Sequence, residues 1–272
     1  MLKKTFQIIK SNPIIILFYA AYLVITVLIM LLLYPRSIGQ ETYLQNGMFD
    51  FSLYMIIMGK ILLAAFLMFV IGLFFVSGFG NMIRAAVISG KTQVSSFLTG
   101  IKLFFVRILL SVLLIFAIVL AASVLLGVIS IPFTMIAVMN GVSSPITFVM
   151  IIMAITLLLI LIPTPFVMLW LPAMFLENTK VFQGLKLGAK AGAKNYWRLI
   201  LATTLLFIPE IIYMIFNYDI AATGRIFTLG YFILIAVMGI LSLIFYVYIF
   251  ELYHEYRLKM MPLDPQPISG NQ

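Results

Sequence analysis

Six long apolar segments joined by short connections constrain the fold of this chain more than any other feature of its sequence. A helix needs about 20 residues to cross the ~30 Å hydrocarbon core of a bilayer, and each segment is at least that long. Backbone groups left without partners in lipid cost several kcal/mol each, which favours helices over irregular structure. We therefore predict an all-α integral membrane fold with six transmembrane helices. Their approximate bounds are residues 13–34, 52–78, 104–131, 146–176, 196–217 and 226–250.

The composition agrees with a membrane protein, because 64% of the residues are apolar and only 9% are charged. A chain of 272 residues has room for six spans but not for a further soluble domain of typical size. We predict one membrane domain over residues 1–259 and a flexible cytoplasmic tail over residues 260–272. The chain has no cysteine and one histidine, which excludes disulfides and disfavours a metal site or a bound cofactor.

Positive charge is concentrated in every second connection. Of the 17 Lys and Arg residues, 14 lie in the N-terminal segment, the second and fourth connections with their edges, and the C-terminal tail. Only Arg36 and Arg225 lie on the opposite side. The positive-inside rule therefore predicts that both termini are cytoplasmic. The net charge of +9 is expected to face anionic lipid headgroups, and nucleic acid is not an expected partner.

The cytoplasmic segments before the first, third and fifth spans have the spacing of short amphipathic helices. The clearest one carries basic residues at four-residue steps: Lys186, Lys190, Lys194 and Arg198. We predict a helix along the inner membrane surface, where this face binds anionic lipid or a protein partner. An interfacial helix followed by two spans would then repeat at about residues 1–78, 90–176 and 180–252. The alternative is that amphipathic connectors resemble one another without a repeat.

Three glycines, Gly184, Gly188 and Gly192, form a ridge of small residues on the same segment. Such a ridge lets another helix approach the backbone closely, so we predict a helix-packing role. Each glycine also weakens the helix by about 1 kcal/mol relative to alanine. A mobile connector is therefore the alternative.

The residues around the fourth connection resemble those of a known group of proteins. The stretch Pro163–Glu177 places prolines and an acidic residue at the inner end of a span, Val181–Lys186 begins a basic helix, and Asn195–Arg198 opens the next span. This pattern resembles bacterial six-span membrane domains of uncharacterised function, including the membrane domain attached to some glycerophosphoryl diester phosphodiesterases. The resemblance implies a bacterial cytoplasmic membrane and the six-span fold. It does not transfer phosphodiesterase activity, because the soluble catalytic domain is absent from this sequence.

Two ionisable residues, Lys60 and Glu210, interrupt the apolar segments, and charged groups are costly there. Counting ~1.5 Å per residue from the outer edges places both at ~12 Å depth. They could form a translocation or ligand site or a structural ion pair, and Lys60 could instead extend outward to water. Pro209 precedes Glu210 and removes a backbone donor, so it would bend the helix beside the carboxylate.

Other polar groups give no convincing catalytic set. Glu251, His254 and Glu255 near the end of the last span are expected to be solvated charges. The prolines of the fourth span, Pro163, Pro165 and Pro172, are expected to bend or break it. No motif typical of an ATPase, a dinucleotide-binding protein or an intramembrane protease is present in the right context.

These observations predict a non-enzymatic multi-pass membrane protein that is permease-like or binds a lipid or small molecule. The alternative is a scaffold or regulatory subunit that assembles with another envelope protein or enzyme. A polar cavity reaching Lys60 and Glu210 would favour the first function. A stable partner bound through residues 180–198 would favour the second.

Overall fold

The computed structural model describes residues 1–33, 44–45, 48–139, 162–216 and 229–260 of the chain. The described residues are helical apart from turns and one short hairpin, in which β1 (Leu44–Gln45) pairs antiparallel with β2 (Met48–Phe49). In this part of the chain, five helices are long and apolar enough to cross a membrane. The helical, multi-pass membrane character predicted from the sequence is therefore supported.

The five long helices occupy the predicted spans one, two, three, five and six. They are α2 (Pro13–Leu33), α3 (Phe51–Ser89), α4 (Val94–Met139), α9 (Tyr196–Phe216) and α11 (Leu229–Met260). With 39 residues, α3 is ~58 Å long, which is well beyond the ~30 Å of a hydrocarbon core. The predicted second span therefore covers only the apolar part of a longer helix.

About half of the predicted fourth span, residues 146–161, lies outside the described part of the chain. Its described end consists of two short helices, α6 (Thr164–Met168) and α7 (Trp170–Leu176), with a break at Leu169. Pro172 has no N–H to donate to the Met168 carbonyl, four residues earlier, which explains why the helix breaks there. The sixth span is thus not confirmed. The predicted flexible tail also lies almost wholly beyond the described residues.

Two of the three predicted interfacial helices are separate elements, namely α1 (Leu2–Ser11) and α8 (Val181–Lys194). The second is not, because its residues are the first turns of the continuous helix α4. Asn12 precedes a proline, which disfavours helical geometry and separates α1 from α2; α4 has no such residue between Val94 and Phe104. The threefold repeat is therefore not confirmed.

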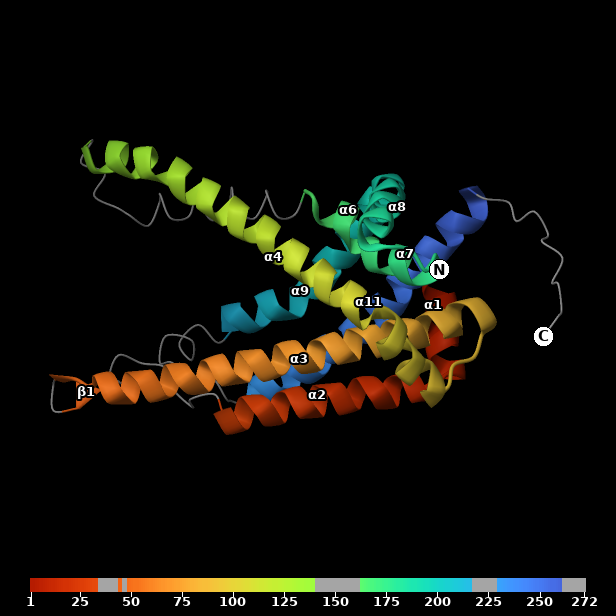
Figure 1. Ribbon diagram of the computed structural model, residues 1–272, viewed down its shortest axis with the longest axis horizontal. Coiled ribbons are helices and arrows are strands. Elements are labelled where there is room, and N and C mark those ends of the chain that lie inside the picture. Colours follow the sequence, from red (N-terminus) through yellow and green to blue (C-terminus); the bar gives the residue numbers. More distant parts are fainter. Residues whose placement is uncertain (34–43, 46–47, 140–161, 217–228, 261–272) are drawn as a thin grey trace. The chain divides into compact units, whose positions relative to one another are not determined.

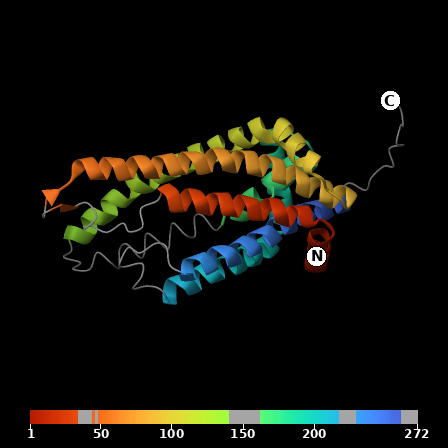
Figure 2. The same cartoon turned by 90° about the horizontal axis from the view of Figure 1, so that it is seen from below.

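Residues 1–105 and 201–272 form one compact unit. In this unit α2 and α3 lie side by side and antiparallel (Figures 1 and 2), and α11 packs against α1, α2 and α3. The contact between α2 and α3 is aromatic: the rings of Tyr22 and Phe75 stack with centroids 4.0 Å apart, and the ring centroid of Tyr19 lies 5.9 Å from that of Phe75. At Gly239 α11 approaches α2 closely, and a Cβ there would lie 2.5 Å from the end of the Leu23 side chain.

Residues 106–200 form the second compact unit. Within it α8 lies against α6 and α7 (Figure 1). The indole N–H of Trp170 donates to the backbone carbonyl of Val181 at 2.8 Å, which ties α7 to the first residue of α8. Arg107 on α4 donates to the side-chain oxygen of Asn178 at 2.8 Å and so holds the turn before α8.

Candidate functional site

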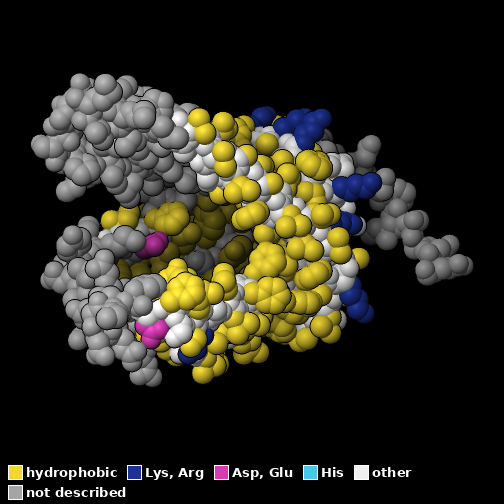
Figure 3. Space-filling model, turned by 60° about the vertical axis from the view of Figure 1, so that its left-hand side comes forward, with side chains coloured by type: hydrophobic (Ala, Val, Ile, Leu, Met, Phe, Trp, Pro, Cys, Tyr) yellow, Lys and Arg dark blue, Asp and Glu magenta, His cyan; other side chains and the backbone are white. Residues whose placement is uncertain are grey.

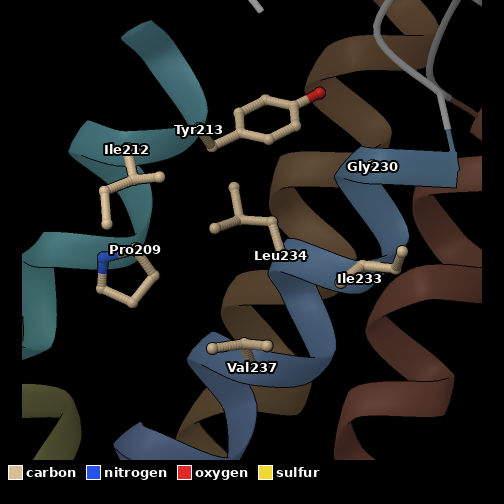
Figure 4. Close-up of a pocket in the computed structure, with 7 residues that line it drawn as sticks. All are labelled: Pro209, Ile212, Tyr213, Gly230, Ile233, Leu234 and Val237. Atoms are coloured by element: carbon tan, nitrogen blue, oxygen red, sulfur yellow. The ribbon is translucent and has the colours of Figure 1, made fainter. Parts of the chain in front are cut away.

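An apolar groove lies between α9 and α11 in the first unit (Figure 4). Its volume is about 370 Å³, which is within the range of ~300–1,000 Å³ that small-molecule sites occupy. Three residues of α9 and four of α11 line it: Pro209, Ile212, Tyr213, Gly230, Ile233, Leu234 and Val237. The lining is therefore almost entirely aliphatic.

The groove follows from the spacing of these residues along two helices. Each set recurs at steps of three and four residues, which places its members on one helix face. Gly230 has no side chain and leaves space at the N-terminal end of α11. Tyr213 carries the one hydroxyl in the lining, and Figure 4 shows its ring reaching across from α9 with the hydroxyl directed away from Pro209. The arrangement suits an apolar ligand and offers little polar recognition.

The predicted intramembrane polar residues are not brought together at this groove. Pro209 lines it, within a helix that continues on both sides of the proline. Glu210 is partly exposed and is not part of the lining. Lys60 on α3 is exposed, and between these two described residues there is no ion pair. Lys60 and Glu210 were placed at equal depth by counting along the sequence, but they do not pair with each other in the structure.

The surface around the groove is itself apolar. Hydrophobic side chains cover most of the described surface visible in Figure 3, with few acidic groups among them. On α9 and α11, the exposed aliphatic residues include Leu205, Ile211 and Ile240. Such a surface is expected to face lipid, so a molecule reaching the groove from the bilayer would not cross water.

The predicted basic surface lies on the exposed side of α8 and at the start of α9. Lys186, Lys190, Lys194 and Arg198 are all exposed. Two aromatic side chains accompany them, Phe182 with 71% and Trp197 with 79% of its surface accessible. A basic helix with exposed aromatic residues is typical of an interface with anionic lipid.

The opposite face of α8 carries the three glycines. A Cβ at Gly184 would lie 3.0 Å from the Cβ of Met174, and one at Gly188 would lie 2.6 Å from the backbone nitrogen of Trp170. A Cβ at Gly192 would overlap the carbonyl group of Pro165. The ridge is therefore the surface on which α6 and α7 approach the backbone of α8.

One polar contact was missed by the sequence analysis. Glu251 was expected to be solvated, but its side chain is 2% exposed and forms an ion pair with Lys4 of α1. Glu255, one turn later, bonds Lys259 at 2.7 Å near the surface. The spacing of Glu251 and Glu255 along the helix could not show which of the two is buried, because the partner of Glu251 lies 247 residues away in the sequence. Within the described residues no group of His, Cys, Asp and Glu could hold a metal ion.

A family model described as a domain of unknown function (DUF7847) matches residues 1–256. The chain belongs to this family. The DUF7847 match covers α1 to nearly the end of α11, so it includes both the groove and the basic surface. No protein of curated function and no solved structure matches the chain. The comparisons give no support to the resemblance to the membrane domain of glycerophosphoryl diester phosphodiesterases or to a bacterial origin.

Proposed function

We propose that this chain is a non-enzymatic, lipid-binding membrane domain that holds one acyl chain in the groove between α9 and α11. The observation that carries the proposal is the aliphatic lining of this groove on two helices that are apolar enough to cross a membrane. Burying apolar surface stabilises a complex by about 25 cal/mol per Å². An acyl chain can supply such surface without a polar partner.

Binding fits the site better than transport does. A permease for a polar solute needs polar groups along its path, and intramembrane charges are expected to line it. The groove is aliphatic, while Glu210 lies outside the lining and Lys60 is exposed on another helix. A permease-like role is therefore the weaker form of the proposal, and it would require transport that depends on Glu210.

Photolabelling with a diazirine derivative of palmitic acid tests the proposal. The full chain is purified in neutral detergent, labelled at increasing probe concentration, and digested to locate the adducts. We expect saturable labelling within residues 209–213 and 230–237 that unlabelled palmitate competes away. Labelling that never saturates and is spread over all exposed helices would contradict the proposal.

A matched pair of variants controls for a general effect of larger side chains. Val237→Trp fills the groove, whereas Ile240→Trp adds the same ring to an exposed position of α11 that does not line it. We expect saturable labelling to be lost in the first variant and kept in the second. Equal labelling of both would argue against the groove as the site.

A scaffold function is the second candidate, and the exposed face of α8 favours it. Lys186 and Lys190 lie on this face with Phe182, so charged and aromatic groups are available to a partner. Copurification of a stable partner from the native membrane, lost when both lysines are changed to glutamine, would support this candidate. Loss of anionic lipid alone would assign the face to the membrane surface.

The proposal also covers the orientation of the chain in its membrane. The distribution of basic residues supports cytoplasmic termini, with α1 and α8 on the inner membrane surface. A bacterial cytoplasmic membrane is proposed from the residues of the fourth connection alone. The variants Leu2→Cys and Lys259→Cys test the orientation. The accessibility of each introduced cysteine to a reagent is measured in intact cells and in open membranes.

A further inference from the structure

The first helix, α1, lies at the end of a membrane span and across it. Figures 1 and 2 show α1 turned across the axis of α2, and the two helices meet at Asn12. Because α2 is long and apolar enough to cross a membrane, a helix across its end runs along the membrane surface. The position of α1 therefore gives it access to lipid headgroups.

One side of α1 is held to the protein by a buried carboxylate. Lys4 forms an ion pair with Glu251 of α11, whose side chain is almost fully buried. The other carboxylate oxygen of Glu251, Oε2, is buried and accepts no hydrogen bond from the described residues. Thr5 and Ile9 of α1 are buried as well. A buried carboxylate is costly without a cationic partner, so the ion pair holds this side of α1 against α11.

Another side of α1 is apolar but exposed. Leu2 and Phe6 are 59% and 53% accessible, and their four-residue spacing places them on one helix face. Each is two positions from Lys4 in the sequence, and residues two apart do not share a helix face. The ion pair with Glu251 therefore turns Leu2 and Phe6 away from itself.

The other two lysines of α1 border this apolar face. Lys3 follows Leu2, and Lys10 lies about one turn after Phe6 and two turns after Lys3. Both lysines are exposed, and among the described residues neither forms an ion pair. The helix carries no acidic residue. An apolar face bordered by lysines matches a membrane surface, where acyl chains lie beside anionic headgroups.

We propose that α1 binds anionic phospholipid of the surrounding bilayer. Leu2 and Phe6 enter the acyl region, and the ammonium groups of Lys3 and Lys10 attract the headgroups. Lys4 is a positioning residue, because its ion pair sets the rotation of α1 about its own axis. This surface goes beyond the acyl-chain groove between α9 and α11 and does not rest on it. The groove and the α1 surface can therefore fail separately.

Quenching by brominated lipids tests the proposal. The sequence contains no cysteine, so a fluorescent label can be attached at one introduced cysteine, Phe6→Cys, in the full chain. The protein is embedded in nanodiscs with equal amounts of phosphatidylcholine and phosphatidylglycerol, and one lipid at a time carries bromine on its acyl chains. We expect brominated phosphatidylglycerol to quench the label at least about twofold more strongly than brominated phosphatidylcholine. Equal quenching by the two lipids, or no quenching by either, would overturn the proposal.

A label elsewhere controls for lipid contact in general. Leu32→Cys places it near the other end of α2, at a position that is 78% accessible and has no lysine beside it. The two lipids should quench this label equally. A preference for phosphatidylglycerol as strong as that at Phe6→Cys would overturn a site on α1.

Charge variants in the Phe6→Cys background test the two lysines. Lys3→Gln combined with Lys10→Gln changes exposed side chains only, so this variant should unfold at the same temperature as its parent. It should lose the preference for phosphatidylglycerol, whereas Lys3→Arg combined with Lys10→Arg should keep it. A preference that survives in the glutamine variant would overturn the role of the lysines.

Glu251→Gln tests the positioning role of Lys4. This substitution leaves all three lysines of α1 in place and removes only the carboxylate of the ion pair. Without the pair, α1 no longer holds position 6 toward the acyl chains, so both brominated lipids should quench the Phe6→Cys label less. A merely stabilising pair would lower the unfolding temperature and leave the quenching of the folded protein unchanged, which would overturn the positioning role.

Discussion

The side-chain oxygen of Asn12 accepts a hydrogen bond from the backbone N–H of Thr92 at 2.8 Å, which joins the α1–α2 junction to the turn between α3 and α4. The amide nitrogen of the same side chain donates to the carbonyl of Gly90 at 3.1 Å and to that of Ile8 at 2.9 Å. Asn12 is 3% exposed, so its polar groups depend on these partners. One side chain thus links the α1–α2 junction to the α3–α4 turn at the predicted cytoplasmic end of the first unit.

Asn12→Ala should destabilise the protein by about 2–3 kcal/mol, because it removes the two long-range hydrogen bonds of a buried side chain, to Gly90 and Thr92. The control is Asn195→Ala. Asn195 ends α8 as Asn12 ends α1, but among the described residues its side chain bonds only locally, to the Ala191 carbonyl at 3.0 Å. We expect a loss of about 1 kcal/mol there. Denaturant unfolding of the two variants in detergent measures both losses, and equal losses would show that the link to Thr92 adds nothing.

Gly188→Ala tests the packing of α8 on α7. Alanine favours a helix by about 1 kcal/mol over glycine, but here its Cβ would lie 2.6 Å from the backbone of Trp170. Overpacking typically costs 1–3 kcal/mol, so we expect a net loss of stability and easier proteolysis near residues 177–181. Gly59→Ala is the control, because nothing lies within 4 Å of a Cβ there, and it should be neutral or stabilising.

The Lys4–Glu251 pair should couple more strongly than the Lys259–Glu255 pair. Glu251 is almost fully buried, whereas both members of the second pair are partly or fully exposed. Exposed pairs four residues apart contribute about 0.3–0.5 kcal/mol. Lys4 itself is 58% exposed, which screens its charge, so we expect a coupling of only about 1–2 kcal/mol. Double-mutant cycles in detergent measure both couplings, and a Lys4–Glu251 coupling no larger than the other would contradict this.

Asp50 should make the start of α3 sensitive to acid. The backbone N–H of Leu53 and the hydroxyl of Ser52 donate to its carboxylate, which lowers the pKa of Asp50 below its ordinary value of 3.8. A lowered pKa in the folded state means that the stabilisation is complete above the ordinary value and is lost as pH falls through the lowered one. Asp50→Asn keeps a cap acceptor and should lose this part of the pH dependence. Thermal unfolding between pH 7 and pH 3 compares the two proteins, and identical pH profiles would contradict the role of the carboxylate.

The sequence predicted the helices where one physical requirement dominates. The first span was predicted at residues 13–34 and α2 covers Pro13–Leu33, because the length of an apolar run is set by the thickness of the bilayer. The continuation of α3 to Ser89 was not predicted, since it depends on distant partners. The buried side chain of Asn81, for example, donates through its amide to the carbonyl of Ser96 on α4.

The residues of the candidate sites also differ in whether the sequence alone could identify them. Pro209 stood out because a proline inside an apolar helix is unusual, and the glycine ridge stood out through its four-residue spacing. The other groove residues did not, because Ile233 and Val237 have the same local pattern as any lipid-facing residue. Such sites require the tertiary arrangement.

The most direct test of the acyl-chain groove is equilibrium binding of radiolabelled palmitate to the full chain in neutral detergent. The account predicts one saturable site in the unchanged protein and in Ile240→Trp, and at least tenfold weaker binding in Val237→Trp. Glu210→Gln should bind like the unchanged protein, because Glu210 does not line the groove. Binding of equal strength in Val237→Trp and Ile240→Trp, or the absence of a saturable site in the unchanged protein, would contradict the central claim.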